Sequence, residues 1–135
     1  MKPQIAQNLR DHHIQPSAQR LAVASYVLFT DDHPSADEVW AKVKKHFPMI
    51  SRATVYNTLN LFVAKRLLRA LVLAEGKVVF DPKLVDHHHF IDDRTGAIYD
   101  IPWDALEVRK IESLRGFRVG EYQVVMRGRR QAQRK

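Results

Sequence analysis

Three serines in the first half of the chain each precede a stretch whose apolar residues recur at helical spacing. Serine is a residue whose side chain accepts a hydrogen bond from the first turn of a helix. With these serines as N-caps or first residues, the predicted helices cover residues 17–30, 35–46 and 52–66. Three short helices in tandem, joined by short turns, predict a helix-turn-helix core.

The second and third of these helices carry further local signals. Ser35 and Glu38 have the spacing of a capping box, in which each side chain binds a backbone N–H of the other residue. The third helix has an apolar stripe of Val55, Leu59 and Phe62, which leaves its other face polar. The pattern therefore predicts a helix with one buried and one exposed side.

A β-hairpin is predicted directly after the third helix. Two β-prone runs flank Glu75 and Gly76, and glycine permits the tight turn that a hairpin needs. A hairpin in this position is the wing of a winged helix. We therefore predict a winged-helix DNA-binding domain over residues 1–82.

The second half of the chain has a different pattern. A strand, a turn at residues 94–96 and a second strand are followed by a predicted helix over 104–116 and a third strand over 117–128. A β-β-α-β unit of about 45 residues is too small to bury a good core alone. Residues 83–127 are therefore predicted to be a dimerisation and metal- or haem-sensing domain, and residues 128–135 a basic disordered tail. The predicted fold class is α+β.

Charge and composition limit the possible binding partners and the possible kinds of site. The chain has 22 Lys and Arg residues against 15 Asp and Glu, a net charge of +7, which favours a polyanionic partner. Nucleic acid is a better partner than a membrane surface, because we find no basic amphipathic helix with a wide apolar face. The absence of cysteine excludes disulfides, thiolate zinc sites and cysteine nucleophiles. No stretch approaches the roughly 20 apolar residues of a membrane span, and we expect a cytoplasmic protein.

The start of the third helix supplies candidate contacts to DNA. A helix N-terminus in the major groove presents short polar side chains to base edges and its dipole to phosphates. Thr54 and Tyr56 can contact thymine methyl groups, and Asn57 can pair with adenine. The predicted DNA-binding residues, with two arginines for phosphates, are Arg20, Ser51, Arg52, Thr54, Tyr56 and Asn57. The alternative is a plain helical bundle with a solvated polar face, which the hairpin makes less favoured.

A run of three histidines is the clearest sign of metal binding. Adjacent strand residues point to opposite faces, so His87 and His89 share one face and His88 lies on the other. Three further residues at suitable places complete a predicted ligand set of His33, Asp81, His87, His89 and Asp100. Nitrogen and oxygen donors of this kind suit Fe²⁺, Mn²⁺ or Zn²⁺. The alternatives are a solvated histidine cluster and axial ligation of haem.

Several motifs resemble the ferric uptake regulator superfamily. They lie at residues 16–20, 33–39, 53–59 and 86–91, and the resemblance extends from about residue 15 to residue 127. The triple histidine, the absence of cysteine and the sequence of residues 92–102 are most similar to the iron response regulator branch.

This resemblance implies a homodimer that binds AT-rich, dyad-symmetric operator DNA through two winged helices. The regulatory metal site of such proteins lies between the two domains, at positions that match the five predicted ligands. The iron response regulator branch controls iron and haem-biosynthesis genes, and haem binding at His87, His88 and His89 is expected to release DNA. Asp92 and Thr95 stand where many relatives have their first pair of zinc-binding cysteines, so no structural cysteine zinc site is expected.

The prediction is a transcriptional repressor or regulator of iron and haem genes, and not an enzyme. Within the family, the same ligands would serve a peroxide sensor, in which bound iron leads to oxidation of its own histidine ligands. A metallohydrolase is the rival from another class. No obvious general base or substrate pocket accompanies the histidines and aspartates, and a winged helix is a poor host for such an enzyme.

Overall fold

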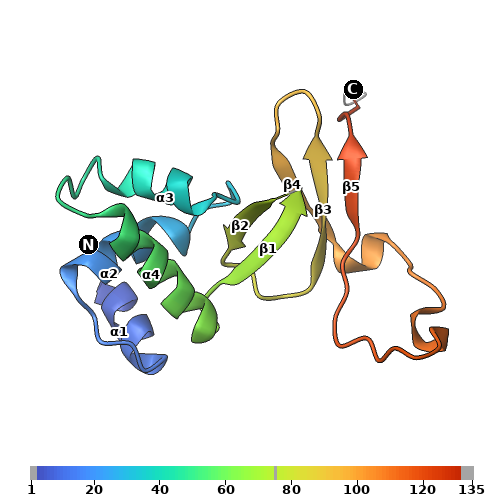
Figure 1. Cartoon of the computed structure of the whole chain (residues 1–135), viewed down its shortest axis with the longest axis horizontal. Helices are drawn as coiled ribbons and strands as arrows, with labels where there is room; N and C mark the ends of the chain where they lie inside the picture. Colours follow the sequence, from blue (N-terminus) through green and yellow to red (C-terminus); the bar gives the residue numbers. More distant parts are fainter. Residues whose placement is uncertain (1–2, 75, 132–135) are drawn as a thin grey trace. The chain divides into compact units, whose positions relative to one another are not determined.

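Four α-helices precede the first strand in the computed structural model, which describes residues 3–74 and 76–131 (Figure 1). Their bounds are α1 Pro3–Asp11, α2 Ala18–Val27, α3 Ala36–Val43 and α4 Arg52–Ala64. The chain divides into two units between Leu84 and Val85, and all four helices belong to the first. No helix in the described part of the chain is long and apolar enough to cross a membrane.

The three predicted N-caps are all confirmed. Ser17 and Ser51 cap α2 and α4, each accepting a hydrogen bond from the backbone N–H three residues later, at 3.2 and 3.0 Å. The Ser35 side chain accepts from the Glu38 N–H at 3.3 Å, and Glu38 accepts from the Ser35 N–H at 3.1 Å. Each cap provides a partner for a backbone donor that has none within its helix.

The helix ends differ from the predicted ones, and α1 was missed. Helix α2 ends at Val27 and α3 at Val43, three residues before the predicted ends. Helix α1 was not predicted, although Ile5 and Leu9 are one turn apart and both are buried. That spacing is the signal from which the helix could have been found.

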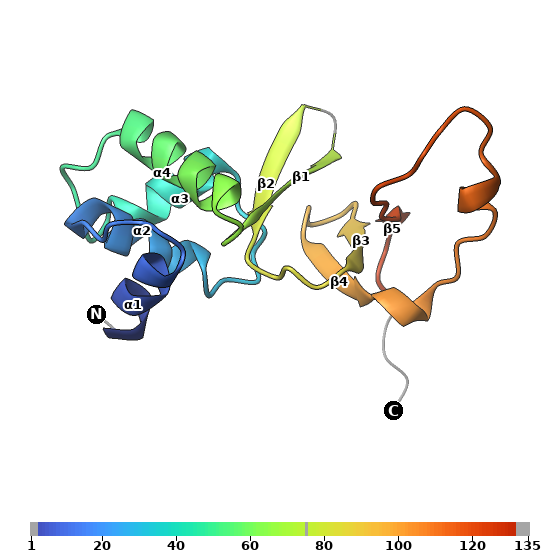
Figure 2. The ribbon, with the colours of Figure 1, turned by 90° about the horizontal axis from the view of Figure 1, so that it is seen from below.

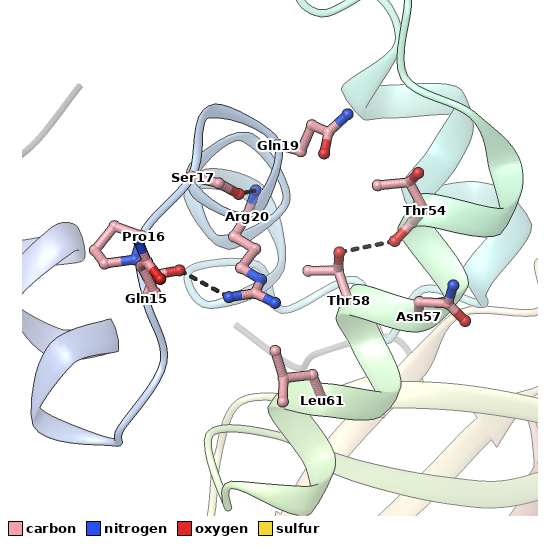
Figure 3. A pocket seen from close by; sticks show the side chains of 9 residues that line it. All are labelled: Gln15, Pro16, Ser17, Gln19, Arg20, Thr54, Asn57, Thr58 and Leu61. Carbon is pink, nitrogen blue, oxygen red and sulfur yellow. Dashed lines mark hydrogen bonds between the residues drawn. The ribbon is translucent and has the colours of Figure 1, made fainter.

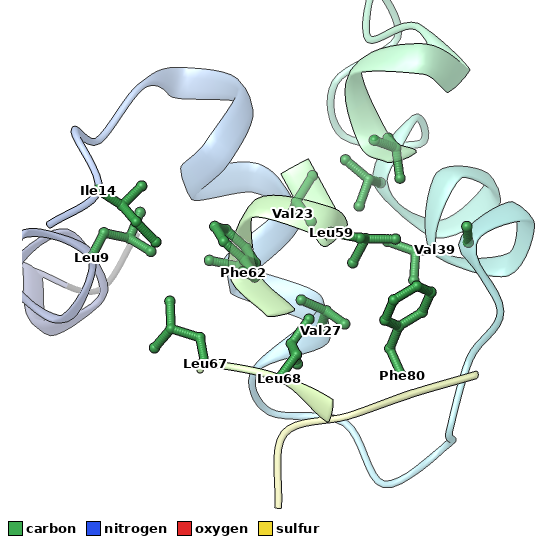
Figure 4. Packing of buried hydrophobic residues seen from close by; sticks show 14 of the residues in the cluster. Leu9, Ile14, Val23, Val27, Val39, Leu59, Phe62, Leu67, Leu68 and Phe80 are labelled. Carbon is green, nitrogen blue, oxygen red and sulfur yellow. The ribbon is translucent and has the colours of Figure 1, made fainter. Parts of the chain in front are cut away.

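The core of the first unit lies among the four helices. Val55, Leu59 and Phe62 of α4 are fully buried, which confirms the predicted apolar stripe. Figure 4 shows Phe62 and Leu59 packed among side chains from α2 and from the segment that follows α4. Phe80, from the hairpin, belongs to the same core, so the hairpin is anchored to the helices.

The hairpin is formed by β1 (Arg69–Ala74) and β2 (Lys77–Asp81), which pair antiparallel. Gly76 in the turn has a φ of 69°, a left-handed conformation that glycine adopts without steric cost. The other predicted turn residue, Glu75, lies outside the described residues. A hairpin directly after α4 confirms the winged helix-turn-helix fold (Figure 2).

The second unit contains a three-stranded sheet in the order β4-β3-β5. Strand β3 (His87–Asp92) pairs antiparallel with β4 (Ile98–Pro102) and parallel with β5 (Val125–Gly128). Asp92 and Thr95 stabilise the turn between β3 and β4, because their side chains accept backbone N–H groups at 2.8 and 3.1 Å. Both side chains therefore serve to form this turn.

The predicted helix over residues 104–116 is wrong. The segment instead contains two 3₁₀ turns, Trp103–Ala105 and Ile111–Ser113, and Lys110 between them has a φ of 68°. An α-helix cannot pass through a left-handed residue without interruption. The unit is thus β-β-β with an irregular connection before β5, and the predicted last strand shortens to Val125–Gly128. The α+β class itself is confirmed.

Part of the predicted disordered tail can be described. Gly128 ends β5, and the Arg130 guanidinium lies 4.6 Å from the centroid of the Tyr99 ring. Residues 132–135 of the predicted tail lie outside the described residues.

Candidate metal centre and nucleic-acid interface

His33 and Asp81 are brought together within the first unit. His33 Nε2 lies 3.3 Å from Asp81 Oδ2, and both side chains are buried. A backbone hydrogen bond joins the two segments at this point. The Pro34 carbonyl, directly after His33, accepts the N–H of Phe80, directly before Asp81, at 2.9 Å. The other carboxylate oxygen of Asp81 accepts the Lys83 N–H at 2.8 Å, which fixes the rotation of the carboxylate.

His87, His89 and Asp100 are brought together within the second unit. The two histidines are alternate residues of β3, and their ring centroids are 4.6 Å apart. The antiparallel register sets His89 opposite Asp100 on β4. Asp100 Oδ1 lies 3.2 Å from His87 Nε2 and 3.7 Å from His89 Nε2. The strand alternation predicted from the sequence is therefore confirmed for these two histidines.

The other ring nitrogen of each histidine has a hydrogen-bond acceptor. His87 Nδ1 lies 2.7 Å from the Val85 carbonyl, and His89 Nδ1 lies 2.8 Å from Gln123 Oε1. An acceptor at Nδ1 selects the tautomer with its proton there, so a neutral ring presents a Nε2 lone pair toward Asp100. Lone pairs of nitrogen and carboxylate oxygen repel unless a proton or a cation lies between them. The donor set and its hydrogen bonds therefore fit a metal ion.

Sequence analysis missed Gln123. It lies 34 residues from His89 along the chain, and no local pattern marks it. We expect Gln123→Ala to weaken metal binding about 10- to 100-fold, because the partner of a ligand orients the ring and raises its basicity. Competition with a chelating dye measures the affinity. Gln123→Glu is the matched control, because it retains an acceptor oxygen and should bind metal more tightly than the alanine variant. Equal affinities for wild type and Gln123→Ala would exclude this role.

His88 lies on the opposite face of β3 and has other contacts. Its ring stacks on Trp103 at 4.5 Å, and the Trp103 ring lies 4.7 Å from Tyr122. His88 Nδ1 accepts the Val124 N–H at 2.9 Å. With only 1% of its surface exposed, His88 holds the segment before β5 against the sheet. Of the three haem candidates, only His87 and His89 share a face.

The predicted DNA contacts fall into two groups around α4. Arg20, Thr54 and Asn57 line one concavity of about 370 Å³ between the start of α2 and α4 (Figure 3). Arg20 donates to the Gln15 carbonyl at 2.9 Å, which directs its guanidinium along this concavity. Ser51 is used as the cap of α4, and its hydroxyl also donates to Thr54 Oγ1 at 2.9 Å.

Arg52 and Tyr56 form the second group, beside α3. Both bind Asp37, which sequence analysis also missed. Hydrogen bonds from Arg52 and Tyr56 hold the pKa of Asp37 below its usual value, and the bond to Asp37 raises the pKa of Arg52. Tyr56 and Asp37 line a concavity of about 540 Å³ that reaches to Lys77 of the hairpin.

Residues 11–127 of the chain match the family model described as the ferric uptake regulator family. The chain belongs to the ferric uptake regulator family. Members of this family are transcription regulators that bind DNA. The peroxide operon regulator of Bacillus subtilis (strain 168) is 30% identical over 124 residues, which cover 90% of this chain and 86% of that protein.

Solved structures of ferric uptake regulators have the same fold. The Vibrio cholerae protein superposes with a TM-score of 0.74 at 25% identity, over 92% of this chain and 98% of that chain. The Pseudomonas aeruginosa protein superposes with a TM-score of 0.70 at 23% identity, over 95% of this chain and 98% of that chain. The predicted family is thus confirmed, while the iron response regulator branch stays a prediction.

Proposed function

We propose that this chain is a DNA-binding regulator whose affinity for its operator is set by a divalent metal ion held by His33, Asp81, His87, His89 and Asp100. The observation that carries the proposal is a histidine–aspartate pair with a buried histidine in each of the two units, at 3.2–3.3 Å between nitrogen and oxygen. Each group alone offers too few donors for a tight site. Together they would supply two carboxylates and three imidazoles, a set that suits Fe²⁺, Mn²⁺ or Zn²⁺.

The position of these ligands in the chain suggests how metal would control DNA binding. His33 and Asp81 precede the boundary at Leu84, whereas the other three ligands follow it. An ion bound by all five would join the DNA-binding unit to the second unit. In a homodimer this would fix the separation of the two α4 helices, which must match half-sites about 34 Å, or a multiple, apart. The Vibrio cholerae regulator shows a structural rearrangement of its DNA-binding domains, a change of the kind this proposal requires.

Removal of metal tests the proposal directly. A duplex selected by the Mn²⁺-loaded protein from a random pool serves as the operator. We expect chelation to change operator affinity about 5- to 150-fold, the usual range of coupling between two sites. Gel retardation with and without Mn²⁺ measures it. Equal affinity for the chelated and the loaded protein would contradict metal control.

Peroxide sensing is the second candidate function, and the relatives favour it. The Bacillus subtilis relative is a peroxide operon regulator, and the Staphylococcus aureus (strain USA300) relative, 31% identical, is a peroxide-responsive repressor. The net reaction transfers one oxygen atom of hydrogen peroxide to a ring carbon of a ligand histidine, and the other leaves as water. Bound iron would supply the redox chemistry. His87 and His89, with Nε2 atoms 3.2 and 3.7 Å from Asp100 Oδ1, are the candidates for this oxidation.

Mass spectrometry after peroxide treatment separates this candidate from simple metal control. We expect iron-loaded protein to gain the mass of one oxygen atom on a peptide with a ligand histidine and to lose operator binding. The Mn²⁺-loaded protein is the matched control and should remain unmodified. Loss of operator binding without any histidine oxidation would contradict the peroxide mechanism.

Haem control and homodimer formation remain proposals for this chain. Haem would compete for His87 and His89, the two histidines that share a face, and would release the metal link between the units. A homodimer would bury the apolar surface that a small second unit cannot cover alone. With no cysteine in the chain, folding and dimer formation should persist after exhaustive chelation.

A further inference from the structure

Asp37, Arg52 and Tyr56 form a closed network on the surface of the first unit. Arg52 donates from Nε to Asp37 Oδ1 at 2.7 Å and from Nη2 to Asp37 Oδ2 at 3.1 Å. The Tyr56 hydroxyl donates to Asp37 Oδ1 at 3.0 Å and accepts from Arg52 Nη2 at 3.2 Å. The guanidinium also lies 5.2 Å from the centroid of the Tyr56 ring. One carboxylate thus organises two of the predicted DNA-binding residues.

The two-pronged bond to Asp37 uses the same donors that would bind a DNA phosphate. A guanidinium donates hydrogen bonds to carboxylate and phosphate oxygens through the same pair of N–H groups. The Arg52 and Asp37 side chains are 57% and 58% exposed, so a phosphate can reach them. In the free protein the positive charge of Arg52 is therefore matched by an internal anion.

Asp37 and a DNA phosphate would compete for Arg52, and Asp37 lies beside the predicted DNA-binding surface. Asp37 is the second residue of α3, where the positive end of the helix dipole favours a carboxylate. It lines the same concavity as Tyr56 and Lys77, and Lys77 Nζ is itself 3.6 Å from Glu38 Oε1. One residue of each of two ion pairs, Asp37 and Lys77, thus lines the hollow between α4 and the hairpin.

We propose that Asp37 is a specificity-determining residue, which holds Arg52 and Tyr56 in place and competes with DNA phosphates for Arg52. This inference rests on the proposed function, because it takes the start of α4 as the DNA-binding surface. On DNA without an operator sequence, the phosphate must displace the carboxylate, and binding is weakened. On the operator, the Tyr56 ring held by Asp37 is already positioned for base contact, which offsets that loss. Asp37 thus lowers non-specific affinity more than operator affinity.

The test compares Asp37→Asn with wild type, both as Mn²⁺-loaded full-length protein, on the selected operator and on a scrambled duplex of equal length. We expect about fivefold tighter binding to the scrambled duplex and a log–log salt slope steeper by about 0.9, the increment for one more phosphate contact. The ratio of operator to scrambled affinity should fall. Asp11→Asn removes the same charge from α1, and it should change neither the ratio nor the slope by as much.

A second variant shows whether Asp37 acts through Arg52. In an Arg52→Ala background, Asp37→Asn should no longer tighten binding to the scrambled duplex. An Asp37→Asn protein with wild-type slope and wild-type specificity ratio would overturn the inference, as would an equal gain in the Arg52→Ala background. If Arg52→Ala and Tyr56→Ala both leave operator affinity unchanged, the DNA-binding surface itself is wrong. These results distinguish failure of the inference from failure of the proposed function.

Discussion

Replacing His87 and His89 together with alanine is expected to weaken Mn²⁺ binding by at least about 100-fold. Loss of only a hydrogen-bond partner of a ligand costs about 10- to 100-fold, and this variant loses two ligands. The two rings contact the same oxygen of Asp100, so their removal leaves that carboxylate without either imidazole. Because the proposed metal links the two units, the variant should also lose the effect of Mn²⁺ on operator binding.

The matched control for this variant is His46→Ala, which removes an exposed histidine of the first unit. It should retain wild-type affinity for Mn²⁺ and a wild-type metal response. The same double variant tests haem control, because haem should no longer release DNA from it. If the double variant keeps wild-type metal content and wild-type haem sensitivity, the ligand assignment is incorrect.

Tyr56→Ala is expected to lower operator affinity by about 1–3 kcal/mol, the usual worth of a good base contact. The ring is half-buried beside α3, and its hydroxyl is bonded to Asp37, so it is held before DNA arrives. The loss should be larger on the operator than on a scrambled duplex, because a base contact carries sequence information and a phosphate contact does not.

Tyr56→Phe separates the ring from the hydroxyl. It keeps the surface that can contact a thymine methyl group and removes the two hydrogen bonds of the hydroxyl, to Asp37 and to Arg52. We expect operator affinity closer to wild type than to Tyr56→Ala. Fluorescence anisotropy of wild type and both variants with the operator and the scrambled duplex gives the six affinities needed. An alanine variant that binds the operator as tightly as wild type would rule out α4 as the recognition helix.

The parts of the fold that the sequence predicted are those set by local interactions. A cap such as Ser35 with Glu38 depends on residues three apart, and an apolar stripe such as Val55, Leu59 and Phe62 depends on the helical repeat. The shared face of His87 and His89 follows from the alternation of a strand. For each of these, neighbours in the chain determine the geometry.

The parts that could not be predicted depend on residues far apart in the chain. Gln123 reaches His89 across 34 residues, and Asp37 reaches Tyr56 across 19. The apolar residues of the segment over 104–116 suggest a helix, but their spacing does not support one. Leu106 and Val108 are two residues apart and lie on different sides of a helix, whereas the observed chain turns at Lys110.

The reciprocal effect of DNA on metal binding is the most direct measurement of metal control. Calorimetric titration of Mn²⁺ into the full-length protein, free and saturated with the selected operator, gives the two metal affinities. Since linkage is reciprocal, we expect their ratio to equal the ratio of operator affinities with and without Mn²⁺, and to differ from one by at least about fivefold. Equal Mn²⁺ affinities for the free and the DNA-bound protein would show that the ion does not control DNA binding.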